Sequence, residues 1–72
     1  MKEGDLVRLM AAGDKEIERV VVEIRPGVLL VATIEEYRQA QEEGREPSCV
    51  GFPVEFALET VGGVDDQPNL NP

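Results

Sequence analysis

Residues 17–32 read IERVVVEIRPGVLLVA, and this stretch decides the fold class. In Ile17–Arg25, apolar residues alternate with mostly charged ones, which is typical of a strand with one buried face. The expected apolar face consists of Val20, Val22 and Ile24. Pro26 and Gly27 suit the central positions of a type II turn, because Pro presets φ and Gly accepts a positive φ. Val28–Ala32 is apolar throughout, so the stretch predicts a β-hairpin whose second strand lies centrally or beneath another element.

A first strand is expected before this hairpin, over Asp5–Met10. Alternation along a strand places Val7 and Leu9 on one face. Leu6 and Met10 fall on the opposite face, so we expect them to point outward.

A helix is predicted after the hairpin, over Ile34–Glu43. The Thr33 hydroxyl can accept a hydrogen bond from a free N–H of the first turn, and Glu36 three residues later completes a capping box. Gly44 ends the helix, because Gly readily adopts the left-handed conformation found there. The narrow apolar stripe that should pack consists of Ile34, Tyr37 and Ala40.

Two more strands are expected near the end of the chain. Ser48–Phe52 reads as the fourth strand, and Pro53–Phe56 is long enough for a single 3-10 turn. Ala57–Val61 is a short last strand, with Leu58 inward and Glu59 outward.

A single domain is expected over residues 1–61. The chain has 72 residues, which allows one small domain and no more. From Gly62 onward it consists of turn formers with two isolated apolar residues, so residues 62–72 are predicted to be a disordered tail.

The order of predicted elements resembles that of an SH3-like barrel. Residues 51–59, GFPVEFALE, resemble the SH3 stretch in which a strand ends in Phe-Pro, a 3-10 turn follows and an aromatic residue precedes the final strand. Residues 2–9, KEGDLVRL, resemble the first strand of small bacterial SH3-like proteins. The resemblance implies a mostly β fold, namely a five-stranded antiparallel barrel with one inserted α-helix, in the order β-β-β-α-β-(3-10)-β.

The resemblance does not extend to the whole peptide groove of SH3 domains. That groove binds proline-rich peptides through aromatic residues that include a Trp, and this chain has no Trp. Pro53 and Phe56 correspond by position to the proline and the last aromatic residue of the groove, and nothing supplies the rest. We therefore expect no binding of that kind.

The charge balance bears on the class of partner. Fifteen Asp and Glu residues against seven Lys and Arg give a net charge of −8, which disfavours nucleic acid and anionic lipid surfaces. Arg8, Arg19 and Arg25 are interrupted by glutamates and do not form a basic stripe. A nucleic-acid-associated barrel is the alternative function, because some SH3-like barrels bind RNA or DNA.

The residue types argue against catalysis. The chain has no His, which is the commonest general base and metal ligand. Cys49 lies in an apolar strand beside Val50, so a buried structural thiol is expected. Adjacent carboxylates such as Glu42 and Glu43 lack the desolvated cleft that acid–base chemistry needs. We predict no enzymatic activity, no cofactor and no metal.

Cysteine usage and the N-terminal residues indicate a compartment. A single Cys cannot form an intramolecular disulfide, which favours a reducing environment. Acidic residues occupy the N-terminus where a signal peptide would need an apolar run, and no apolar stretch approaches membrane-spanning length. We expect a cytoplasmic protein with no membrane association.

Outward apolar residues on the first two strands suggest a protein partner. Tyr37 either covers one end of the barrel or joins them in an apolar patch. The candidate partner-binding residues are Leu6, Met10, Val21, Tyr37, Pro53 and Phe56. The acidic surface favours a basic partner, and a homodimer is a further alternative. The predicted function is a non-enzymatic protein–protein interaction module or accessory subunit.

Overall fold

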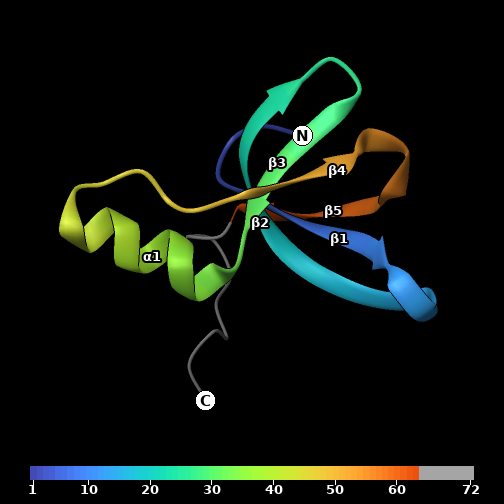
Figure 1. Ribbon diagram of the computed structural model, residues 1–72, viewed down its shortest axis with the longest axis horizontal. Coiled ribbons are helices and arrows are strands. Elements are labelled where there is room, and N and C mark those ends of the chain that lie inside the picture. The colour runs from blue at the N-terminus through green and yellow to red at the C-terminus, as the bar shows by residue number, and fades with distance from the viewer. Residues whose placement is uncertain (64–72) are drawn as a thin grey trace.

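The computed structural model describes residues 1–63, which form a mostly β structure with one open antiparallel sheet (Figure 1). The strands lie in the order β4-β3-β2-β1-β5. Their bounds are β1 Asp5–Ala11, β2 Lys15–Arg25, β3 Val28–Ala32, β4 Val50–Pro53 and β5 Ala57–Gly63. Helix α1 spans Ile34–Glu43, and two 3-10 turns, η1 and η2, span Ala12–Asp14 and Val54–Phe56. The predicted order of elements is confirmed, whereas closure of the sheet into a barrel is not seen in this part of the chain.

Local sequence signals account for the hairpin and the helix. Gly27 has a φ of 77°, as the predicted turn between β2 and β3 requires. The Thr33 hydroxyl accepts a hydrogen bond from Glu36 N at 3.1 Å, and Gly44 ends α1 with a φ of 68°. The predicted bounds of β3 and α1 are confirmed. The Glu36 carboxylate does not close the capping box, because it bonds to the connector after the helix instead.

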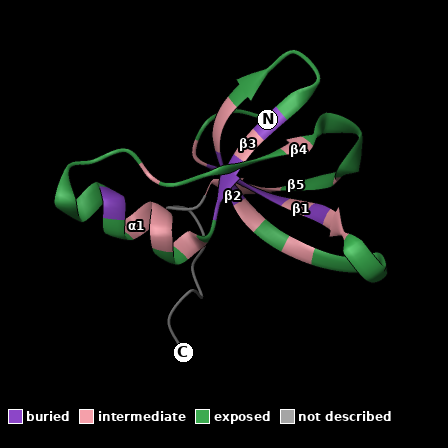
Figure 2. Cartoon of the chain, in the orientation of Figure 1, coloured by how far each residue is buried: buried purple, intermediate pink, exposed green. Residues whose placement is uncertain are grey.

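The central strands β1, β2 and β3 carry buried residues on both faces of the sheet. On one face, β1 and β2 pair with Leu6 opposite Val20. We call the face that carries these two residues the helix face, since Ile34 and Tyr37 of α1 pack on it. The other face, which we call the core face, carries the larger cluster of buried residues: Val7, Leu9, Val21, Leu29 and Val31. Figure 2 shows most of the buried residues of the sheet near the centre of the view, where the strands converge.

Two predicted orientations are therefore wrong. Leu6 and Val21 are only 2% and 0% exposed, so neither points outward to a partner. The register of β2 against β3 also shifts between Val21 and Glu23, which inserts Val22 as an extra residue. Because of this bulge, the expected alternation fails and Ile24 is exposed rather than buried.

The last two strands also differ from expectation. In β5, Glu59 pairs with Arg8 and Ala57 with Leu9, so the shift in register leaves Leu58 unpaired and 46% exposed rather than inward. β4 begins at residue 50, two residues later than predicted. β5 extends over residues 62–63, and the rest of the predicted tail, residues 64–72, lies outside the described residues.

Leu9 and Leu58 allow a matched test of the register. Truncation of the fully buried Leu9 by Leu9→Ala should lower the free energy of unfolding by about 3 kcal/mol, because it removes packed methyl groups and leaves a cavity. Leu58→Ala should cost about 1 kcal/mol or less, since that side chain is half exposed. Urea unfolding of both variants measures the difference, and equal losses would contradict the register of β5.

Candidate functional site

Exposed apolar side chains gather at one end of the sheet. Among residues 1–63, seven large apolar side chains are exposed, and four of them belong to the β2–β3 hairpin or to η2. We call these four the hairpin-end surface: Ile24, Val28, Val54 and Phe56. The other three, Met1, Val50 and Leu58, lie elsewhere in the chain, so this end of the sheet is a candidate contact surface.

Turn η2 lies against the hairpin tip (Figure 1). Val54 N donates a hydrogen bond to Gly27 O at 3.0 Å, and Val28 pairs with Pro53 across β3 and β4. One 3-10 turn of three residues is too short to bury a face of its own. Val54 and Phe56 are consequently 44% and 45% exposed beside the hairpin.

Around the hairpin-end surface, the charged side chains are either a glutamate without an ion pair to any residue of 1–63 or an arginine that is paired with a glutamate. Glu55 is exposed between the two apolar residues of η2, and no ion pair joins it to another residue of the described part. Glu23 pairs with Arg25 at 2.7 Å, and the hydrogen bond and positive charge of Arg25 lower the pKa of Glu23. Glu55 is therefore the available charge at this surface, and it favours contact with a cation.

The predicted partner-binding residues divide between this surface and the interior. Pro53 and Phe56 are exposed at the end where η2 meets the hairpin. Leu6 and Val21 are buried on opposite faces of the sheet, so the predicted patch that included them does not form.

Tyr37 and Met10 are half-buried. Tyr37 packs against the buried pair on the helix face, and a Cβ at Gly4 would lie 3.5 Å from its hydroxyl oxygen. The covering role expected for Tyr37 as one of two alternatives fits this packing.

Sequence reasoning missed Val28 and Val54 as surface residues. Val28 follows the turn at Pro26 and Gly27 and begins β3, and Val54 follows Pro53 at the end of β4. That position was the available signal, because side chains beside turns are commonly exposed.

The arginines form no basic stripe. Arg8 lies among carboxylates of both neighbouring strands: it pairs with Glu59 of β5, and with Glu16 at 3.7 Å and Glu18 at 3.8 Å on β2. Arg19 instead donates a hydrogen bond to the carbonyl oxygen of Glu18 at 2.8 Å. Exposed pairs of this kind contribute little stability, so their effect is to neutralise the positive charge of Arg8.

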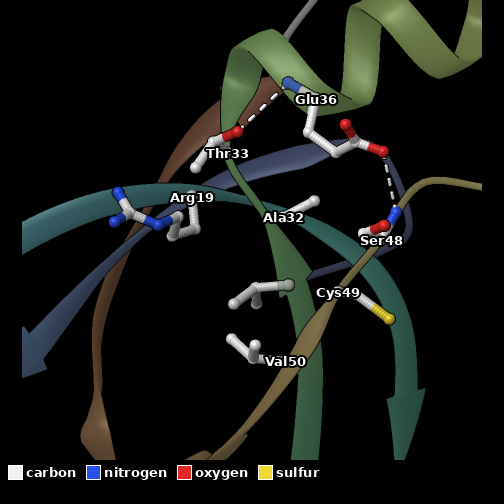
Figure 3. A pocket seen from close by; sticks show the side chains of 8 residues that line it. Arg19, Ala32, Thr33, Glu36, Ser48, Cys49 and Val50 are labelled. Carbon is white, nitrogen blue, oxygen red and sulfur yellow. Dashed lines mark hydrogen bonds between the residues drawn. The ribbon is translucent and has the colours of Figure 1, made fainter.

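A second feature, at the other end of β4, is the anchoring of the connector between α1 and β4. Glu36 accepts a hydrogen bond from Ser48 N at 2.9 Å (Figure 3). It also pairs with Arg45, which in turn pairs with Glu43. The Arg45 hydrogen bond, with that from Ser48 N, lowers the pKa of Glu36; Arg45 and Gln39 lower that of Glu43. Both carboxylates raise the pKa of Arg45. The helix thus fixes the start of β4.

Cys49 is exposed, which contradicts the buried thiol expected from the sequence. The reason is that the β3–β4 pairing begins one residue later, with Val31 opposite Val50. Cys49 therefore lies in the connector, outside the ladder.

Three further findings concern metal ligands, membrane-spanning helices and similarity to known proteins. No group of three potential metal ligands occurs in residues 1–63, and no helix there is long and apolar enough to cross a membrane. Comparison with protein-family models, curated proteins and solved structures finds no match for the chain. The function is therefore inferred from the geometry of the chain itself.

The anchoring of the connector predicts a pH-dependent stability. Because the pKa of Glu36 is lowered on folding, its stabilising effect is present above the ordinary value of 4.5 and is lost as the pH falls through the lower value of the folded state. Glu36→Gln should therefore unfold at lower denaturant than the wild type at pH 7, with a gap that narrows below pH 4.5.

Glu42→Gln is the matched control, since Glu42 is an exposed glutamate of the same helix. Denaturant unfolding at pH 7 and at about pH 3 compares the variants. A Glu36→Gln gap that stays constant over this range, or that Glu42→Gln reproduces, would refute the role given to Glu36.

Proposed function

We propose that this chain is a non-enzymatic protein-interaction module of SH3-like type, acting in the cytoplasm, whose hairpin-end surface binds a basic segment of a partner protein. The strand order and the 3-10 turn directly before β5 support the SH3-like assignment. The observation that carries the proposal is the gathering of exposed apolar side chains around η2 and the hairpin tip.

The chemistry of the surface supports this class of partner. Apolar residues such as Val54 and Phe56 supply the contact area that drives association, and aromatic side chains are frequent anchors in interfaces. Glu55 lies between them, and the whole chain carries a charge of −8. A basic segment with apolar side chains would be complementary to both features, and electrostatic attraction would speed its encounter with the chain.

Capture experiments test the proposal. The full chain is immobilised and exposed to a cytoplasmic extract, in parallel with a Val54→Ser/Phe56→Ser double variant and with Val50→Ser. Val50 is the control because it is also exposed, more so than Val54, and lies at the other end of β4. We expect a basic protein to bind the wild type and Val50→Ser, and to bind the double variant at least about tenfold more weakly, a loss of about 1.4 kcal/mol.

Direct titration with the purified partner measures this difference. Equal binding to the double variant would contradict the proposal. Recovery of nuclease-sensitive material that is released steeply by salt would favour the nucleic-acid alternative instead.

Charge at the same surface gives a separate prediction. Glu55→Gln should slow association with the basic partner about two- to threefold at about 20 mM salt, and the effect should shrink at about 150 mM salt because the charge is then screened. Stopped-flow kinetics at the two salt concentrations measure the rates. Glu42→Gln, on α1, should leave them unchanged, and a rate insensitive to both salt and Glu55 would exclude electrostatic attraction at this surface.

A further inference from the structure

A pocket of about 450 Å³ lies at the end of β4 opposite the hairpin-end surface (Figure 3). The ladder between β3 and β4 stops at the pair Val31–Val50, and the two backbones part beyond it. One leads into α1 and the other comes from the connector. The residues that line the pocket are Arg19, Val31, Ala32, Thr33, Glu36, Ser48, Cys49 and Val50.

The walls of this pocket are held in place without a ligand. Glu36 ties the connector to the first turn of α1 through Ser48 N and through Arg45. Thr33 fixes that turn in place by capping Glu36 N. The volume falls within the range of small-molecule sites, which are usually formed before the ligand binds.

The interior of the pocket is apolar. Val31 belongs to the buried core, and Ala32 is 3% exposed. Val50 is 59% exposed, the largest fraction among the exposed large apolar residues of the described part. An apolar ligand body that covers Val50 would remove this surface from water, which stabilises the bound state.

Arg19 is the positive charge available in this pocket. It lies opposite Val7 in the β1–β2 ladder, so its side chain is on the core face, and it is one of the residues that line the pocket. No carboxylate of residues 1–63 pairs with its guanidinium, and its hydrogen bond to Glu18 O uses a single donor nitrogen. The remaining donors suit a carboxylate, which a guanidinium can bind through two parallel hydrogen bonds.

The one carboxylate in the pocket, that of Glu36, is already occupied. Both of its oxygen atoms accept hydrogen bonds from Arg45, and one accepts from Ser48 N as well. It therefore offers little to a ligand ammonium group. The negative charge of the chain opposes anions at long range, but at physiological salt this field decays within about 8 Å, so direct contact with Arg19 decides the preference.

We propose that this pocket binds a small organic carboxylate with an apolar body, whose carboxylate pairs with Arg19 and whose apolar part covers Val50. The proposal is independent of the partner surface at the hairpin end. It adds a ligand site of the opposite charge preference to the same small domain.

Cys49 provides the measurement, because this exposed thiol lines the pocket and is the single cysteine of the chain. A bound ligand should slow its alkylation by the neutral reagent iodoacetamide. For an eight-atom probe such as hexanoate, ordinary binding energy per ligand atom corresponds to a Kd of about 10 mM, so about 50 mM hexanoate should slow alkylation about sixfold. Hexylammonium at the same concentration and ionic strength should slow it less than about twofold.

Variants separate the role of Arg19 from a general effect of the probe. Each rate is divided by the rate of the same variant without probe, and circular dichroism checks that the variant is folded. Arg19→Gln should lose the protection by hexanoate, whereas Arg25→Gln, on the same strand outside the pocket, should keep it.

Three outcomes would overturn the proposal. The first is less than about twofold protection of the wild type by hexanoate. The second is equal protection by hexanoate and hexylammonium, which would indicate apolar binding alone. The third is protection of folded Arg19→Gln equal to that of the wild type.

Discussion

The structure depends on covering the central strands on both faces. Leu6 lies opposite Val20, so the neighbouring Val7 and Val21 must lie on the other side of the sheet. All four are almost fully buried. Leaving one such side chain in water would cost about 2 kcal/mol, so neither face can remain uncovered in a domain this small. On the helix face α1 supplies the cover, and on the core face Phe52 and Ala57 of the edge strands pack against the cluster.

This cover is limited to the central strands, and the edge strands β4 and β5 of the described part carry no buried residue. At the hairpin end, η2 is too short to bury its own apolar residues, so Val54 and Phe56 remain exposed. At the other end, the backbones of β3 and β4 separate toward α1 and the connector, which leaves a pocket beside Arg19. The hairpin end therefore carries an exposed apolar surface with the negative charge of Glu55, whereas the other end has a pocket beside the positive charge of Arg19.

Short-range signals in the sequence were sufficient to predict where the hairpin turn lies and where the helix begins and ends. The turn at Pro26 and Gly27, the cap at Thr33 and the stop at Gly44 each depend on residues within one turn of the chain, and all three are present. These signals, with the apolar patterns between them, were enough to predict the order of strands and helix along the chain.

Burial and register depend on which strands pair and how, and the sequence pattern of a single strand does not predict them. Alternation along β1 and β2 defines two faces but does not show that both are covered, so it predicts that Leu6 and Val21 point outward, whereas both are buried. The bulge at Val22 and the unpaired Leu58 arise from register shifts against neighbouring strands. At the candidate site, Pro53 and Phe56 could be identified from local resemblance, whereas Val54 could not, because its exposure depends on where η2 meets the hairpin.

Two-sided burial is the central claim, and solvent paramagnetic relaxation of methyl protons in solution NMR tests it most directly. A soluble paramagnetic probe broadens signals according to their exposure. The methyl groups of Leu6, Val20 and Val21 should all be protected, and those of Val54 and Leu58 should be strongly broadened. Broadening of Val21 or Leu6 to the level of Val54 would show that one face of the sheet is open to water, and would contradict the account.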